Sequence, residues 1–149
     1  MTKVTTVGES GNAGLRTQMR GEERRIESQH ERLDSLCQEL YWRIDKDGPT
    51  HAIGECLLFI TALDAHMTME EDVFFPVLYG LRADLGPELE VLVDEHAEFR
   101  VEAAEIKDKL RANDREGARM ALDLLARRIS EHERVEEALL ARITEGPMG

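Results

Sequence analysis

Apolar side chains recur every three or four residues along most of the chain, which is the spacing of one face of an α-helix. The first such stripe covers about residues 22–45, and further stripes cover about 51–82, 87–112 and 115–144. Turn-forming residues separate them, because Asp47-Gly48-Pro49 follows the first stripe and Asn113-Asp114 precedes the last. No alternation typical of strands competes with this pattern. The sequence therefore predicts four amphipathic helices.

Four amphipathic helices joined by short loops bury their apolar faces most simply in an antiparallel up-down-up-down four-helix bundle, so we expect an all-α fold. We assign this bundle to residues 22–145 as a single domain. Residues 1–21 are polar and rich in Gly, Ser and Thr without a sustained period, so we expect a disordered N-terminal arm. Pro76 lies inside the second helix and removes one backbone donor, which predicts a local kink.

The composition narrows the classes of partner. The chain has 149 residues, with 19 Lys+Arg against 31 Asp+Glu and a net charge of -12. This acidic excess argues against a phosphate-binding surface, so we expect neither a nucleic-acid partner nor a membrane partner. The longest apolar run, around Cys56 to Leu63, is far shorter than the ~20 residues that span a bilayer, and no signal peptide is visible. Cys37 and Cys56 then indicate reduced thiols and a cytoplasmic location.

Each apolar stripe contains one histidine, and the spacing of these histidines repeats. His30 and His66 are 36 positions apart, as are His96 and His132. A glutamate follows the second histidine of each pair by four positions, so both halves of the chain read H-x35-H-x3-E. The repeat is typical of a duplicated helical hairpin. The six residues are His30, His66, Glu70, His96, His132 and Glu136.

Antiparallel pairing would place these six residues at one height in the bundle. Residues equidistant from a turn lie side by side in a helical hairpin, and the midpoint of positions 30 and 66 is Gly48, in the first turn. The midpoint of 96 and 132 is Asp114, in the last turn, and that of 66 and 96 is Leu81, at the edge of the middle turn. Each glutamate lies one helical turn from its histidine on the same face. The sequence predicts four imidazoles and two carboxylates that converge in the middle of an apolar core.

Such a core is costly without a cation. Two ionised carboxylates in a low-dielectric interior repel each other, and each burial costs several kcal/mol unless it is compensated. Nitrogen and oxygen ligands without thiolate argue against a closed structural zinc site and suit non-haem iron, with manganese or zinc as substitutes. Two glutamates shared between two ions, with two histidines for each ion, give four protein ligands per ion. We therefore expect two iron ions with an oxo or hydroxo bridge and room for an exogenous small molecule.

The pattern H…HxxxE…H…HxxxE resembles the hemerythrin-like (HHE cation-binding) domain. The resemblance covers about residues 22–145 and includes the segment from Glu70 to Pro76 after the first HxxxE motif. It implies a di-iron centre bridged by Glu70 and Glu136, and binding or chemistry of dioxygen, nitric oxide or peroxide. Oxygen-carrying hemerythrins have a further histidine four positions after that of the third helix, where this chain has Arg100. The resemblance is therefore closer to bacterial relatives that handle nitric oxide or peroxide, or repair iron centres, than to oxygen carriers.

Three functional interpretations stay open at this point. The first is a di-iron protein that binds or turns over a small oxidant, the second is an iron-handling sensor or repair and delivery module with a protein partner, and the third is a metal-free structural bundle. A ferritin-like site is excluded, because it needs Glu-x-x-His on two helices and only Glu27 to His30 matches. We expect Glu71 and Glu137 to face solvent or to support a ligand. We expect His51, which lies ~22 Å from the predicted cluster along its helix, to be exposed near a helix start.

Overall fold

Helices account for almost all of the described chain. The computed structural model describes the backbone of residues 9–145 and the side chains of residues 13–143. Within these residues there is no strand, so the prediction of an all-helical fold is confirmed. The elements are, in order, α1 (Glu9–Asp47), η2 (Pro49–Ala52), α2 (Ile53–Met69), η3 (Glu70–Phe74), α3 (Phe75–Leu81), η4 (Ala83–Leu85), α4 (Gly86–Arg111) and α5 (Arg115–Glu145).

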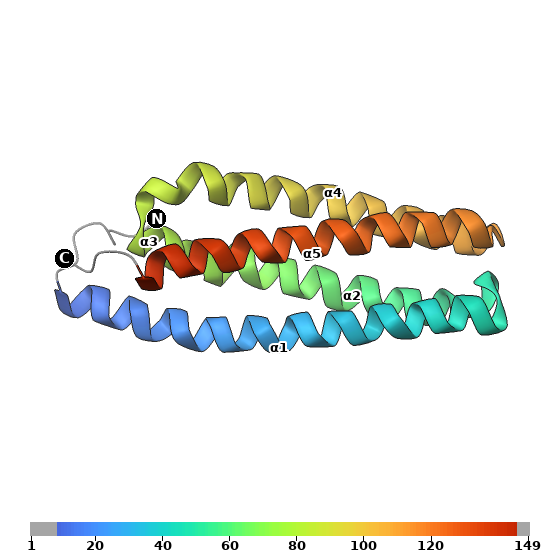
Figure 1. Ribbon diagram of the computed structural model, residues 1–149, viewed down its shortest axis with the longest axis horizontal. Helices are drawn as coiled ribbons and strands as arrows, with labels where there is room; N and C mark the ends of the chain where they lie inside the picture. Colours follow the sequence, from blue (N-terminus) through green and yellow to red (C-terminus); the bar gives the residue numbers. More distant parts are fainter. Residues whose placement is uncertain (1–8, 146–149) are drawn as a thin grey trace.

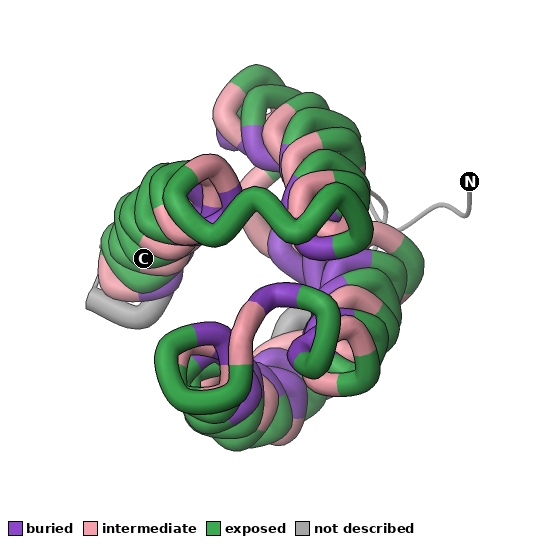
Figure 2. Tube along the Cα trace, turned by 90° about the vertical axis from the view of Figure 1, so that its right-hand side faces the viewer, coloured by how far each residue is buried: buried purple, intermediate pink, exposed green. Residues whose placement is uncertain are grey.

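The helices lie alongside one another as a bundle (Figure 1). α1 runs the length of the molecule and α2 returns beside it, and α4 and α5 form a second pair in the same way. Gly48 (φ 96°) and Asn113 (φ 58°) have positive φ in the two turns at the same end. Asp114 then caps α5, because its Oδ1 accepts a 2.9 Å hydrogen bond from the N–H of Gly117. Seen end-on, the buried residues face the space between the helices (Figure 2).

α1 begins further upstream than the sequence predicts. The prediction of a disordered arm over residues 1–21 is wrong for residues 9–21, which are helical, and residues 1–8 lie outside the described part of the chain. The reason is apolar burial, since Met19 is 1% exposed and belongs to a buried cluster with Leu140 and Ile143 of α5. Met19, Glu22 and Ile26 are all buried at helical spacing, and the polar Glu22 interrupts the apolar stripe on which the prediction relied.

The helical rod from Pro49 to Leu81 changes helix type at residues 70–74, where η3 is a π-helical turn. The N–H of Phe75 donates to the carbonyl of Glu70, five residues back. Pro76 follows at once and has no N–H, so a regular α-helical ladder cannot continue through it. The irregularity predicted at Pro76 therefore takes the form of a π-turn just before it. The turn lies where Glu70 and Glu71 project, and such turns are frequent at functional sites.

Judged by length and composition only, the same rod is long and apolar enough to cross a membrane. No other segment of the described chain passes this test. Core helices of soluble proteins pass the same test, and 33% of the rod's most apolar window is buried inside the protein. Cys56, Phe59 and Leu63 from this rod lie in the core. These buried apolar residues of the rod therefore have a structural role within the bundle.

The core of the bundle consists of two apolar clusters. One lies toward the Gly48 turn and includes Leu40, Phe59 and Leu110, and the other includes Ile26 and Leu89. In each of the long helices, the predicted site residues lie at the boundary between the stretches that supply these two clusters. The fold thus inserts a polar layer between two apolar ones.

Candidate metal centre

All six predicted site residues come together in this polar layer. Five of them are buried and His30 is half-buried. His51 lies in η2, outside the cluster, and is exposed as predicted. The elements contribute His30 from α1, His66 from α2, Glu70 from η3, His96 from α4, and His132 and Glu136 from α5.

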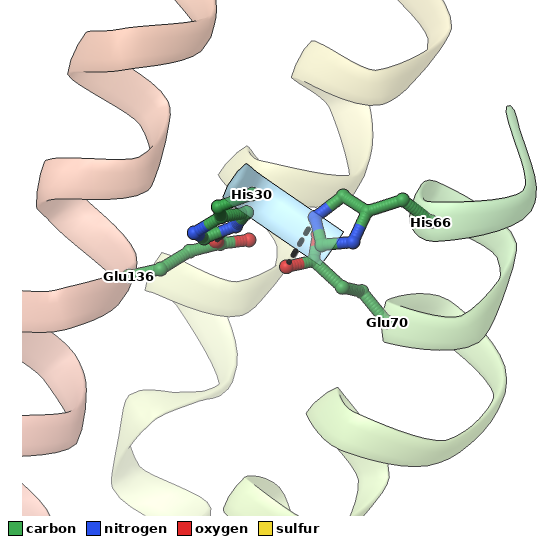
Figure 3. A group of neighbouring side chains, drawn as sticks. All are labelled: His30, His66, Glu70 and Glu136. Carbon is green, nitrogen blue, oxygen red and sulfur yellow. Dashed lines mark ion pairs between the residues drawn. The ribbon is translucent and has the colours of Figure 1, made fainter. Parts of the chain in front are cut away.

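Glu70 lies between two histidines and directs one carboxylate oxygen to each. Its Oε2 atom is 3.2 Å from Nε2 of His66, one turn earlier in the same rod (Figure 3). Its Oε1 atom is 3.0 Å from Nε2 of His96, which belongs to α4. The side chain is completely buried. Glu70 therefore connects a histidine of its own rod with a histidine of α4.

Glu136 repeats this arrangement from α5. Its Oε1 atom is 3.5 Å from Nε2 of His30, and its Oε2 atom is 3.1 Å from Nε2 of His132. Two compact groups result, which share both glutamates, and within each group the ligand atoms all lie within 4.8 Å of one another. The groups are His30, His66, Glu70 and Glu136, and Glu70, His96, His132 and Glu136.

Three of the four histidines are held by an acceptor on their other ring nitrogen. A carboxylate or amide oxygen can only accept, so Nδ1 carries a proton, and in the neutral imidazole Nε2 then turns its lone pair toward the centre. This is the tautomer that a metal ligand needs, and such acceptors also fix the orientation of the ring. The pairs, each with 2.6 Å between Nδ1 and the oxygen, are His66 with Gln29, His96 with Glu71, and His132 with Glu95.

The comparison with protein families bears directly on this geometry. The model of the hemerythrin HHE cation-binding domain matches residues 22–143, which is most of the chain. The chain belongs to this family. Comparison with curated proteins and with solved structures gives no match. The protein is thus an HHE domain whose His and Glu clusters can bind metal.

The buried carboxylates of this HHE domain lack hydrogen bonds within the described protein. Both oxygens of Glu70 and both oxygens of Glu136 are buried without a hydrogen-bond partner. Burial raises the pKa of Glu136, whereas the close approach of His132, His66 and His96 outweighs burial and holds the pKa of Glu70 well below its ordinary value. Burial lowers the pKa of His132, but contacts with Glu136 and Glu70 outweigh it and raise that pKa to about 10. Buried charge of this kind needs compensation, so the orphaned oxygens and the all-nitrogen-and-oxygen donor set fit a pair of cations.

Arg100, which stands where oxygen carriers have their additional histidine, lies outside both ligand groups. Its Nε atom donates to Oδ1 of Asp64 at 2.8 Å, and its Nη1 atom donates to Oε2 of Glu71 at 3.5 Å. Glu71 is also the acceptor for Nδ1 of His96. Arg100 therefore stabilises the carboxylate that orients His96, and Glu71 supports a candidate ligand, which is one of the two roles expected for it.

Two of these acceptors, Gln29 and Glu95, were not predicted, although the sequence contains a signal for them. Each immediately precedes the first histidine of its half, and the two are 66 positions apart, as are His30 and His96. The duplicated hairpin thus includes the acceptor as well as the ligands. The contact was missed because each acceptor holds the histidine of the neighbouring helix, 37 positions further along the chain.

Glu133 is a further residue that the sequence did not indicate. Its Oε2 atom lies 3.6 Å from Nε2 of His30, and its side chain is 23% exposed. By the 66-residue repeat its equivalent is Met67, which is buried and apolar. Glu137, the equivalent of Glu71, is also a glutamate, but it is exposed whereas Glu71 is half-buried. Within the described part of the chain, Nδ1 of His30 consequently has no acceptor of the kind that His96 has in Glu71.

Proposed function

We propose that this HHE domain is a non-haem di-iron protein that binds or reacts with a small oxidant, namely dioxygen, nitric oxide or peroxide, at a carboxylate-bridged centre. One observation carries the proposal. Glu70 and Glu136 each direct one oxygen toward a histidine of the first group and the other oxygen toward a histidine of the second group. This is the arrangement that two carboxylates need in order to hold two ions side by side.

The protein residues would then hold each ion through two imidazole nitrogens and two carboxylate oxygens. Iron commonly takes about six ligands, so about two positions per ion stay available for other groups. When bound, two iron ions would supply one-electron redox chemistry next to those positions, and manganese or zinc are substitutes that the same donors accept. Phe75 and Phe99 cover one side of the centre, with ring centroids 5.7 Å from that of His96 and 5.2 Å from that of His132. They exclude water from that side.

A second function, iron handling without turnover, is supported by a specific feature. Cavities of about 120 and 290 Å³ flank His30, and acidic side chains line both of them. A centre beside such cavities is suited to gaining and losing cations, as a sensor or a repair and delivery module must.

The cytoplasmic setting, and the absence of a nucleic-acid or membrane partner, are also part of the proposal and rest on composition alone.

The experiment that tests the proposal is a metal analysis combined with absorption spectra. Protein purified from iron-rich medium should contain about two irons per chain, with near-ultraviolet absorption that His66→Ala abolishes. A metal-free wild-type protein would contradict the proposal. Spectral change or turnover when the reduced protein meets dioxygen, nitric oxide or peroxide supports the oxidant function. Release of iron to an acceptor without such a change supports iron handling.

A further inference from the structure

The seam between α1 and α5 is open beside the centre. The cavity of about 120 Å³ lies between these helices on one side of His30, and Asp34 and Glu133 are among the residues that line it. The cavity of about 290 Å³ lies on the other side of His30, and Glu27 and Glu137 are among its lining residues. His30 lines both cavities, so the first ligand group has a direct connection to the surface.

The 66-residue repeat gives the physical reason for this opening. Phe75 stacks on His96, with an angle of 18° between the rings. The equivalent of Phe75 in the second half is Ala141, and the equivalent of His96 is His30. Ala141 lines the cavity of about 290 Å³ beside His30, where a phenylalanine would fill the space. The seam is therefore open at this larger cavity because a large residue of the first half is replaced by a small one in the second.

The charge in these two cavities is of one sign. Among the described residues that line them there is no Lys or Arg. At the seams of α4 with α5 and with α2, by contrast, acids are paired with arginines, since Arg128 contacts Glu98 and Glu102 and Arg100 contacts Asp64. A cleft lined by acids with apolar walls concentrates cations and accelerates their association. Glu136, whose buried oxygens have no hydrogen bond, also lines the larger cavity, so a cation that enters can bind there.

Glu133 stands between the outer cavity and the centre. It lines the cavity of about 120 Å³ and also the inner space of about 10 Å³ that His66, Glu70 and His132 help to enclose. It belongs to neither compact ligand group. A carboxylate in this place can contact a cation first in the outer cavity and then in the inner space. It need not be a permanent ligand of an ion in the centre.

We propose that the α1–α5 seam is the path by which divalent cations, ferrous iron among them, reach the centre, and that Glu133 is the transfer ligand on this path. The inference rests on the metal centre proposed above. In the step, a carboxylate oxygen of Glu133 replaces one water of the hydrated cation, and His30 and Glu136 then replace further waters while Glu133 releases the ion. The oxidation state of the cation does not change.

The test measures how fast the metal-free protein takes up Co²⁺, whose visible absorption reports nitrogen and oxygen ligation. Glu133→Gln keeps the shape of the side chain and removes its charge. Glu105→Gln is the matched control, because Glu105 is exposed on α4 and its loss changes the net charge equally. We expect Glu133→Gln to slow uptake about tenfold relative to the control, because a local charge in a cleft contributes that order to association rates. The final number of bound ions and their affinity should equal those of the wild type.

Each other outcome overturns the inference in a distinguishable way. Equal uptake rates for Glu133→Gln and Glu105→Gln would exclude the transfer role. Fewer bound ions at equilibrium would make Glu133 a permanent ligand instead. Failure of the wild type to bind Co²⁺ would overturn the proposed centre together with the path. Glu133→Met, which restores the residue type of the repeat-equivalent Met67, provides a second folded variant should the glutamine variant not fold, and it should be slow as well.

Discussion

Glu136→Gln is the substitution that tests the shared-carboxylate geometry most directly. Both ligand groups contain Glu136, so one substitution removes a ligand from both at once. Glutamine preserves the shape of the side chain but carries no charge and cannot bridge two cations through two equivalent oxygens. We expect the variant to fold and to lose binding of both ions.

The magnitude follows from linkage between binding and folding. At a free metal concentration of about 100 times the Kd, each site adds about 2.7 kcal/mol to the free energy of unfolding, so two sites add about 5 kcal/mol. For a chain of this size, that corresponds to a rise in Tm of about 10–20 °C. Without metal, the two proteins should differ by about 1 kcal/mol, because glutamine preserves the shape of the buried side chain.

The assay is thermal unfolding, followed by circular dichroism, of metal-free protein titrated with ferrous iron under anaerobic conditions or with zinc. Metal content after desalting gives the stoichiometry. Glu137→Gln is the control, because Glu137 is the exposed neighbour of Glu136 and lies outside both ligand groups. The reasoning is refuted if Glu136→Gln keeps two ions and the same metal-dependent rise in Tm as the wild type.

Three further predictions concern the surroundings of the centre and the core. Glu95→Ala should weaken metal affinity ~10–100-fold, measured by competition with a chelator, because His132 loses the acceptor that fixes its ring, and unchanged affinity would contradict this role. Cys37 and Cys56 should react slowly with iodoacetamide at pH 8 until the chain is unfolded, because burial raises both thiol pKa values to about 11. Prompt labelling of the native protein would show that the thiols are accessible. Met19→Ala should lower the free energy of unfolding in urea by about 2–3 kcal/mol, whereas a residue in a disordered arm would give no change.

Most of the ligand set could be predicted, because it depends only on heights along antiparallel helices. The midpoint of positions 30 and 66 lies at Gly48, and the chain does turn there. Residues at equal distance from such a turn are brought level by the regular rise of the helix. The same logic predicted that Glu70 and Glu136 would lie with the histidines, and the structure brings them together.

Features that depend on local exceptions to the helical pattern could not be predicted in this way. The helix upstream of residue 22 was missed, because the stripe that contains Met19 also contains the buried Glu22. The π-turn before Pro76 was expected only as a kink, because periodicity shows that a helix is interrupted but not which hydrogen bonds replace the regular ones. Some contacts between helices could not be predicted either. The approach of Glu133 to His30 depends on how α1 and α5 are rotated about their axes, which the periodicity does not give.

The duplication also explains why the two halves of the centre differ although their ligands are the same. Each half supplies two histidines and one glutamate, so the two candidate ligand groups contain the same residue types. The differences come from residues beside the motif, because Phe75 covers His96 where Ala141 leaves a cavity beside His30. Access to the two candidate ligand groups is therefore unequal, and this inequality follows from the residues at which the second half of the sequence departs from the first.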